Sequence, residues 1–295
     1  MRRPIIVVFL GLFLMAFQAL AAERGALFKV TSKDKTLYLY GTVHAGKPEF
    51  YPLEPRIRAA LAAAPTLALE VDAARDPAAV AAALRQHGMF PAGSPGMAGL
   101  PAERRARIET ALRKLGVDPA SVAQMKPWML TTMLAIVDLG KLGYNPALGV
   151  DAHLAQLARD GKVRIAELES VQYQAALLNR LPDDDQWRML EEALENMASG
   201  RQLREAREIF DAYERADQAA LERIARRIDA DTTVTGKFTR EVVLNERNGP
   251  MADKAASLLA QENNAVVAVG LLHLLGKNGL PELLRQRGIT VERVY

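Results

Sequence analysis

Alternating apolar and polar residues near the start of the chain predict a β-hairpin. Apolar positions recur at about every second residue over 27–30 and again over 37–40, and the polar turn 32–35 separates the two runs. A period of two is that of a strand with one buried face. A helix at 55–64 and a strand at 66–71 follow, and this strand-helix-strand order is typical of a parallel sheet.

The rest of the chain alternates between short apolar strands and long helical stretches. Residues 76–139 and 182–259 have helical composition, and the second stretch carries Arg and Glu at helical spacing. Further strands are expected at 163–169, 265–269 and 289–294, and further helices at 151–159 and 280–287. We therefore expect an α/β fold in which a central, mostly parallel sheet with an N-terminal β-hairpin is flanked by helices. A single domain would span 23–295 and include a large helical insertion at about 182–260.

The first 22 residues have the features of a secretory signal peptide. Arg2 and Arg3 precede an apolar run over 5–17, and Ala19-Leu20-Ala21 has the small residues of a cleavage site. The alternative is an uncleaved anchor, because residues 5–22 are nearly long enough to span a bilayer. We expect an exported protein, periplasmic or secreted, with no membrane span in the mature chain.

Composition narrows the chemistry and the partners. Apolar residues make up 49% of the 295 positions and charged residues 25%, as in an ordinary globular protein. Removing Arg2 and Arg3 with the signal would lower the formal net charge from +3 to +1, so nucleic acid is not an expected partner. The chain has no Cys, which excludes thiolate metal sites and cysteine nucleophiles. A metal ion would need His and carboxylate ligands.

One short pattern occurs twice, near opposite ends of the mature chain. Gly41-Thr42-Val43-His44 and Gly270-Leu271-Leu272-His273 each follow an apolar, strand-like run. The carboxyl ends of neighbouring parallel strands meet at one edge of a sheet, where open α/β folds place their ligands. Glu70 ends the strand at 66–71, which we expect to neighbour the first of these two strands.

Two imidazoles and a carboxylate at one edge are compatible with two kinds of chemistry. His44, Glu70 and His273 form a recognised ligand set for a divalent cation that keeps an open position for water, and the ion would lower the pKa of that water. The same groups could act without metal, as a general base oriented by a carboxylate. The repetition of the pattern disfavours the structural alternative, in which each His merely hydrogen bonds to a loop.

Further motifs give the chain a resemblance to the TraB/GumN family, which includes the Tiki proteins. The resemblance covers about residues 26 to 294 and depends on the order and spacing of the motifs, because each motif is short. They are Tyr40-Gly41-Thr42-Val43-His44, Leu69-Glu70-Val71, Gly149-Val150-Asp151, Glu167-Leu168-Glu169-Ser170 with Gln172, Arg247-Asn248, and Val269-Gly270-Leu271-Leu272-His273-Leu274 with Gly276 and Gly279-Leu280.

The resemblance implies an α/β fold similar to that of erythromycin esterases and haem-binding ChaN-like proteins, with both Gly-x-x-His turns facing one pocket. For Tiki-like proteins it implies metal-dependent peptide hydrolysis, with Mn or Co as the divalent ion. His44, Glu70 and His273 match the family's active-site candidates, and Arg247-Asn248 matches its Arg-Asn element. Arg247 would then hold a carboxylate or stabilise an oxyanion, whereas the alternative is an ordinary surface position on a helix.

Two other carboxylates have open roles. Glu169, at the end of the strand at 163–169, is either a further ligand, or a partner that orients a His, or a carboxylate that precedes a helix N-terminus. Asp151 is expected to begin or cap its helix rather than to bind a ligand.

The sequence favours an exported metal-dependent hydrolase that cleaves an amide or ester bond in a peptide or small-molecule substrate. Its expected catalytic residues are His44, Glu70, His273 and Arg247, of which the first three would hold the metal, with Asn248 as an accessory residue. The alternative is a non-catalytic periplasmic binding protein for a metal, haem or small ligand. Glu70 and Arg247 favour catalysis, because haem ligation requires neither.

Overall fold

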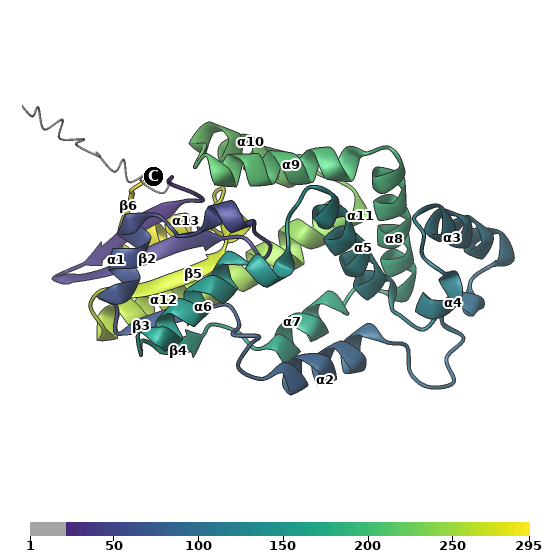
Figure 1. Ribbon diagram of the computed structural model, residues 1–295, viewed down its shortest axis with the longest axis horizontal. Coiled ribbons are helices and arrows are strands. Elements are labelled where there is room, and N and C mark those ends of the chain that lie inside the picture. Colours follow the sequence, from purple (N-terminus) through teal and green to yellow (C-terminus); the bar gives the residue numbers. More distant parts are fainter. Residues whose placement is uncertain (1–21) are drawn as a thin grey trace, which may run out of the picture.

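A six-stranded sheet lies at one end of the molecule in the computed structural model, which describes residues 22–295 (Figure 1). The strand order is β4-β3-β5-β2-β1-β6, and β1 is antiparallel to both of its neighbours, whereas β2, β5, β3 and β4 are parallel. The strands are β1 (Leu27–Ser32), β2 (Lys35–Thr42), β3 (Thr66–Leu69), β4 (Arg164–Glu167), β5 (Ala265–Gly270) and β6 (Thr290–Arg293). The predicted α/β class, with its N-terminal hairpin and mostly parallel sheet, is confirmed.

The strand order differs from the sequence prediction in one respect. β2 and β5 are neighbours, as expected for the two strands that precede the Gly-x-x-His turns, and Thr42 pairs with Gly270. β3, however, pairs with β5 and not with β2, so the prediction that the Glu70 strand borders the first His strand is wrong. The reason is the composition of β5, whose residues 265–269 are all apolar and at most 1% exposed. A strand that is apolar on both faces is buried best in the middle of a sheet.

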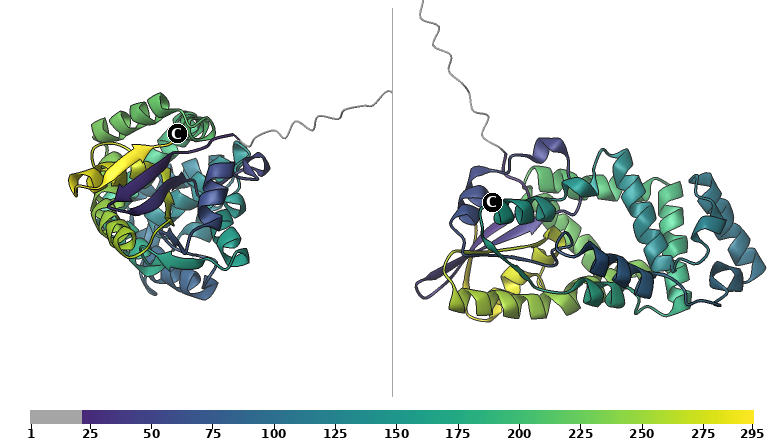
Figure 2. Two further views of the ribbon diagram at one scale, coloured as in Figure 1. Left: turned by 90° about the vertical axis from the view of Figure 1, so that its left-hand side faces the viewer. Right: turned by 60° about the horizontal axis from the view of Figure 1, so that its bottom comes forward.

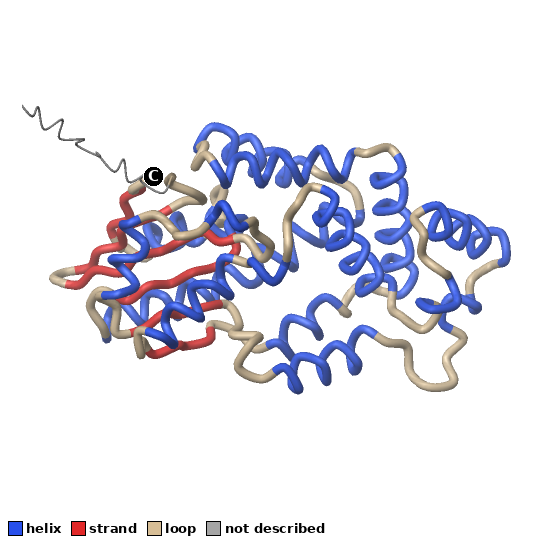
Figure 3. The backbone as a smooth tube through the Cα atoms, viewed as in Figure 1, coloured by secondary structure: helices blue, strands red, loops and turns tan. Residues whose placement is uncertain are grey.

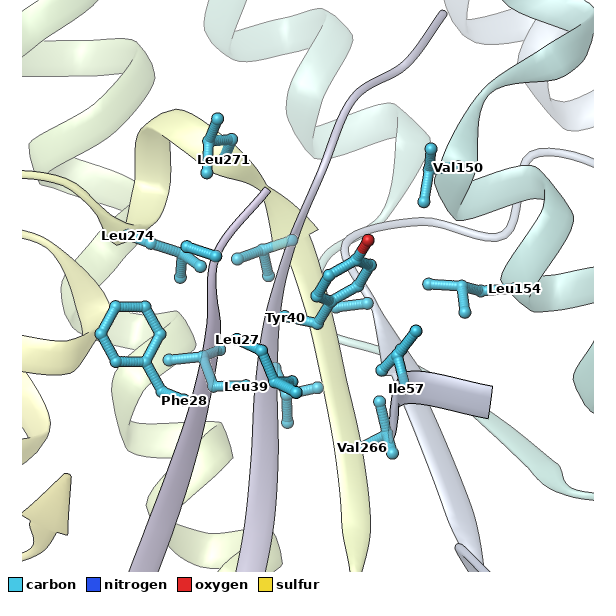
Figure 4. Packing of buried hydrophobic residues seen from close by; sticks show 14 of the residues in the cluster. Leu27, Phe28, Leu39, Tyr40, Ile57, Val150, Leu154, Val266, Leu271 and Leu274 are labelled. Atoms are coloured by element: carbon cyan, nitrogen blue, oxygen red, sulfur yellow. The ribbon is translucent and has the colours of Figure 1, made fainter. Parts of the chain in front are cut away.

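Helices cover both faces of the sheet. Figure 1 shows helices in front of the sheet and behind it, and the end-on view of Figure 2 shows the sheet between them. These helices are α1 (Pro55–Ala62) and α6 (Val150–Asp160) on one face, and α12 (Glu246–Gln261) and α13 (Leu280–Gln286) on the other. Figure 4 shows Ile57 of α1 and Leu154 of α6 beside Tyr40 of β2, and all three side chains are at most 1% exposed. The main core therefore lies between the sheet and these helices.

A helical layer forms the other end of the molecule, where Figure 3 shows no strands among the described residues. It has its own apolar cluster, to which Leu112, Leu130, Trp187 and Leu190 belong. Its helices are α2 (Pro77–Gly88), α3 (Ala102–Lys114), α4 (Pro119–Val122), α5 (Pro127–Lys141), α7 (Val171–Leu178), α8 (Asp183–Ala198) and α11 (Val234–Phe238). The helices α9 (Arg201–Glu214) and α10 (Gln218–Ala230) lead back to the sheet, and Phe210, Leu221 and Ile224 belong to the main core. The helical run expected over 182–259 is present as α8 to α12, and α12 packs against the sheet.

The helical layer stands over the edge toward which the parallel strands run. Figure 1 shows α5 and α9 on the side where β2 and β5 end, so the carboxyl ends of these strands face the helices rather than open solvent. No helix within residues 22–295 has the length and hydrophobicity needed to cross a membrane. The predicted signal peptide at residues 1–22 lies outside the described residues except for Ala22.

Candidate active site at the carboxyl edge of the sheet

The two predicted histidines meet at the carboxyl ends of β2 and β5. His44 follows β2 by two residues, and His273 lies in the short 3-10 helix η5 (Leu271–Leu274) that directly follows β5. Gly270 marks the point of convergence, because a Cβ atom placed on it would lie 3.2 Å from Glu70 Oε1, 3.4 Å from His44 Nε2 and 3.6 Å from His273 Cδ2. A side chain at position 270 would occupy the space that these three groups enclose. His44, Glu70 and His273 therefore lie together at the carboxyl edge of the sheet.

Glu70 is a buried carboxylate with hydrogen-bond donors on both oxygens. It directly follows β3, and its side chain is 9% exposed. Oε1 accepts from the Gly270 amide at 2.6 Å, and Oε2 accepts from Arg247 and from Gln174 Nε2 at 3.3 Å. Burial alone would raise the pKa of Glu70, but His273, Arg247, His44 and the Gly270 amide together lower it to about 2. The carboxylate is therefore ionised throughout the physiological pH range.

Arg247 links Glu70 to a second buried carboxylate, Glu169. Its Nε donates to both oxygens of Glu169 at 3.0 Å, and its Nη2 donates to Glu169 at 2.6 Å and also to Glu70. The side chains of Arg247 and Glu169 are 8% and 6% exposed. The alternative of a surface position for Arg247 is therefore wrong, because the side chain is buried and pairs with two carboxylates of the protein itself. Glu169 precedes α7, as expected, but its carboxylate points to the guanidinium.

A wide helical turn brings Arg247 and Asn248 to the site. The π-helix η4 (Thr239–Asn245) runs directly into α12, and Pro250 lies inside the first turns of α12. Proline has no amide hydrogen and therefore cannot complete the regular bond to the carbonyl four residues earlier. π-helical turns are rare in proteins overall, but those that occur are often found at functional sites. Here the turn directs Val243 and Leu244 to the same pocket as Arg247.

Asn248 fixes the orientation and the tautomer of His273. Its Nδ2 donates to the Asn278 carbonyl at 2.7 Å, so its Oδ1 is the acceptor that faces His273 Nδ1 at 2.6 Å. The proton of the neutral ring therefore lies on Nδ1, and the lone pair on Nε2 faces Glu70 Oε1 at 3.8 Å. Burial, together with the positive charge of Arg247, lowers the pKa of His273 to about 4 against the pull of Glu70. The ring is neutral at physiological pH.

His44 has the opposite environment. Its Nδ1 lies 3.1 Å from Asp151 Oδ2, and its side chain is 68% exposed. The negative charge of Asp151 raises the pKa of His44 to about 9. Its Nε2 remains on the side of Gly270.

Asp151 is a site residue that sequence reasoning missed. It lies in the first turn of α6, as predicted, but it also binds His44. The Val150 amide donates to the Val43 carbonyl at 2.9 Å, and a Cβ on Gly149 would lie only 2.9 Å from the His44 carbonyl oxygen. The absence of a side chain at Gly149 allows α6 to begin against the end of β2. The motif Gly149-Val150-Asp151 was the signal that could have pointed to Asp151, because a glycine before a helix allows a close backbone approach.

Gln174 is a second residue that the sequence did not reveal. Its Nε2 donates to Glu169 Oε2 at 2.9 Å and to Glu70 at 3.3 Å, so it bridges the two carboxylates from α7. Gln172, which belongs to the family motif, is exposed and contacts Gln86 and His87 instead. No local sequence pattern distinguishes the two glutamines.

The charges of the cluster do not balance. The carboxylates of Glu70, Glu169 and Asp151 are opposed by one guanidinium, Arg247, which leaves two negative charges when both imidazoles are neutral. A buried excess of negative charge is costly and favours uptake of a proton or a cation. The raised pKa of His44 is one expression of this excess.

A pocket of about 580 Å³ opens in front of these groups. His44, Arg247 and His273 line its polar side, and apolar residues of α5, α9 and η4 line the rest. Thr42 also lines the pocket, and its hydroxyl is buried without a hydrogen-bond partner among the described residues. A larger hollow of about 780 Å³ lies between α3 and α8 and contains none of the predicted site residues.

The residues present fit a divalent cation in the chemistry of their donors. Each imidazole has its Nδ1 engaged by an oxygen, of Asp151 or of Asn248, which is how metal-binding histidines are usually held. His44 Nε2, Glu70 Oε1 and Cδ2 of the His273 ring surround the space at Gly270, and His273 Nε2 lies 3.8 Å from Glu70 Oε1. Within residues 22–295, however, no group of three or more His, Asp or Glu side chains has the spacing of a ready metal site. The residues therefore suit a divalent cation by the type of their donor atoms, by their negative charge and by their closeness to one another.

The fold and the site define an α/β protein with a polar centre at the carboxyl edge of its sheet, where two Gly-x-x-His turns meet a buried Glu-Arg-Glu cluster. The model of the TraB/PrgY/gumN family matches residues 26–293, and the chain belongs to this family. It is 25% identical over 274 residues to the protein YbaP of Escherichia coli K12, described as uncharacterized, with 90% of this chain and 96% of YbaP covered. The Shigella flexneri YbaP matches with the same identity and coverage. No solved structure matches the chain.

Replacing Arg247 by Met should destabilise the protein by about 3–5 kcal/mol, because two buried carboxylates lose their shared cation. Urea unfolding followed by circular dichroism measures the loss. The matched control is the triple variant Arg247→Met, Glu70→Gln, Glu169→Gln, which has similar volume and no unpaired charge and should regain most of the stability. Equal stability of the single and triple variants would show that the cluster does not depend on charge pairing.

Acid should destabilise the folded state through His273. The unfolded imidazole binds its proton below about pH 6.5, whereas the folded ring does so only below about pH 4, so the free energy of unfolding falls as the pH drops through this window. The shift corresponds to a loss on the order of 3 kcal/mol. Urea unfolding at several pH values, with a chelator present, should give a shallower decline for His273→Asn than for the wild type. Parallel pH profiles of the two proteins would contradict the lowered pKa.

Proposed function

We propose that this protein is an exported metal-dependent hydrolase that cleaves an amide or ester bond in a peptide or small molecule. The observation that carries the proposal is the convergence of His44 Nε2, Glu70 Oε1 and the His273 ring at Gly270, beside a pocket. The surrounding cluster has two uncompensated negative charges when both imidazoles are neutral. A divalent cation matches both the donors and the charge. Export is proposed from the signal-like residues 1–22.

His44, Glu70 and His273 would hold the ion, and the family resemblance suggests Mn or Co. A bound divalent ion supplies a water of lowered pKa and polarises a carbonyl group. Net hydrolysis adds water across the bond between the carbonyl carbon and nitrogen or oxygen, and the leaving group departs with a proton.

The surrounding side chains of the chain orient these three groups. Asn248 keeps the His273 proton on Nδ1, so that Nε2 stays free, and Asp151 does the same for His44 once that ring is neutral. Arg247 and the Gly270 amide hold Glu70 ionised and in one orientation. One Arg247 face also lines the pocket, where its positive charge would favour the negative charge that develops on a carbonyl oxygen.

A non-catalytic binding protein for a metal, haem or small ligand is the second candidate. It is favoured by Glu70, whose oxygens already accept three hydrogen bonds from Gly270, Arg247 and Gln174. A carboxylate with so many donors is a weak base, which suits holding a ligand better than moving a proton. A haem-binding protein would show a Soret band that is lost in His44→Ala or His273→Ala.

The protein purified without chelator or affinity metal should contain close to one equivalent of a transition metal by elemental analysis. The double variant His44→Ala, His273→Ala should lose it, because both Nε2 donors are gone. The matched control is His87→Ala, His153→Ala, which also removes two imidazoles but from positions outside the site. Absence of metal from the wild type, even after incubation with Mn, Co and Zn, would contradict the metal-dependent proposal.

Glu70→Gln should reduce turnover of a cleavable peptide or ester by at least a hundredfold while the protein stays folded. The amide keeps the shape of the side chain but removes its negative charge and one acceptor. Turnover is measured in the metal-loaded protein after a screen of peptide and ester substrates, with circular dichroism to verify the fold. Glu222→Gln, on α10, is the matched control and should leave turnover unchanged. Full activity of Glu70→Gln would remove Glu70 from the mechanism.

A further inference from the structure

The pocket beside the candidate site is apolar over most of its wall. Its polar side, with His44, His273 and Thr42, lies at the ends of β2 and β5, and the rest comes from the helical layer. Figure 1 shows α5 and α9, the helices that supply much of this wall, over the strand ends. The apolar residues that project into the pocket from these helices and from the turns η4 and η5 include Ala135, Ile136, Leu139, Ile209, Val243 and Leu272.

The pocket offers no free charge at its apolar end. The three residues of its lining that can carry charge are His44, Arg247 and His273, and all three belong to the polar side. The guanidinium of Arg247 is already engaged by Glu70, Glu169 and the Val243 carbonyl. A charged group placed between α5 and α9 would lose its hydration without gaining a partner, whereas an apolar group would gain from burial.

We infer that the ligand of this site carries an uncharged aliphatic or aromatic group next to the carbonyl, and that this group lies between α5, α9 and η4. The inference rests on the proposed function, because it takes the carbonyl to lie at the His44 and His273 side. The volume of about 580 Å³ is within the usual range for small-ligand pockets. At about 30 Å³ for each water-sized atom, it would hold on the order of twenty heavy atoms. The substrate class is therefore an apolar acyl compound or a peptide with an apolar side chain at the cleaved bond.

Two neighbouring residues of α5 separate this inference from a general effect of surface hydrophobicity. Ile136 and Val137 are both exposed, at 45% and 55%, but Ile136 lines the pocket and Val137 does not. An Asp at either position adds one negative charge to the same helix at a site where the side chain is solvent-accessible. Only Ile136→Asp places that charge at the wall of the pocket.

The test uses 2-octanone and 2-butanone, two methyl ketones that differ in chain length and cannot be hydrolysed. Calorimetric titration of the metal-loaded full protein should show at least tenfold tighter binding of 2-octanone. Ile136→Asp should weaken 2-octanone binding at least fivefold, whereas Val137→Asp should leave it unchanged. Equal affinity for the two ketones, or equal effects of the two Asp variants, would overturn the inference.

A second variant tests the volume of the pocket without adding charge. Ala135→Phe fills part of the apolar end, so it should weaken 2-octanone binding at least fivefold and leave 2-butanone binding within twofold. Unchanged 2-octanone binding in Ala135→Phe would contradict the proposed position of the chain. If either Ile136→Asp or Ala135→Phe fails to fold, the other still tests the inference, because one variant adds charge and the other fills volume.

Hydrolysis is measured separately, with 4-nitrophenyl acetate and 4-nitrophenyl hexanoate. If neither ester nor any screened peptide is cleaved but the ketones bind as described, the apolar site stands and the proposed hydrolase fails. If esters are cleaved with the same kcat/KM for both chains and the ketones bind equally, the hydrolase stands and the apolar site fails. A preference for the hexanoate that is lost in Ile136→Asp and kept in Val137→Asp supports both.

Discussion

The structure depends on one buried arrangement of charges, in which Arg247 lies between Glu70 and Glu169. None of these groups can be buried alone without a large cost, so each position constrains the other two. They come from three segments that are distant in sequence: the end of β3, the residues after β4, and the start of α12. The Gly270 amide adds β5 to the same point through its bond to Glu70. The sheet edge can therefore pack correctly only when α12 is in its correct place, and α12 can take that place only when the sheet edge has formed.

The same cluster explains why two histidines in similar sequence patterns behave differently. His273 is buried next to the guanidinium and is held by a neutral amide, so its pKa is lowered. His44 is exposed and is held by a carboxylate, so its pKa is raised. With three carboxylates and one guanidinium in the cluster, a proton on His44 neutralises part of the excess charge. A divalent cation at the Nε2 side would compete with that proton, so binding of the ion and loss of the proton would be coupled.

Sequence patterns revealed the strands and the three central residues, because apolar runs and strand-end positions are local features. They did not reveal which strand borders which: β5 separates β2 from β3 because it is apolar on both faces, a property visible in its sequence but not used in the prediction. Asp151 was predicted to begin or cap its helix, and it lies in the first turn of α6. A position at a helix start does not show which residue the carboxylate contacts, and here that residue is His44. Gln174 has no local signal at all. The sequence therefore predicted the helices and strands themselves but not the side-chain contacts across the edge of the sheet.

The site is built from two parts of the molecule, the strand ends and the helices α5 and α9. The strand ends supply the groups that can do chemistry, and their positions are fixed by hydrogen bonds of the sheet and by the buried charges. The helices α5 and α9 supply a wall that is partly free of such constraints, since an exposed residue such as Ile136 contributes little to the core, whereas Phe210 is buried in it. Changes in that wall can alter which ligand fits while the charged cluster stays intact.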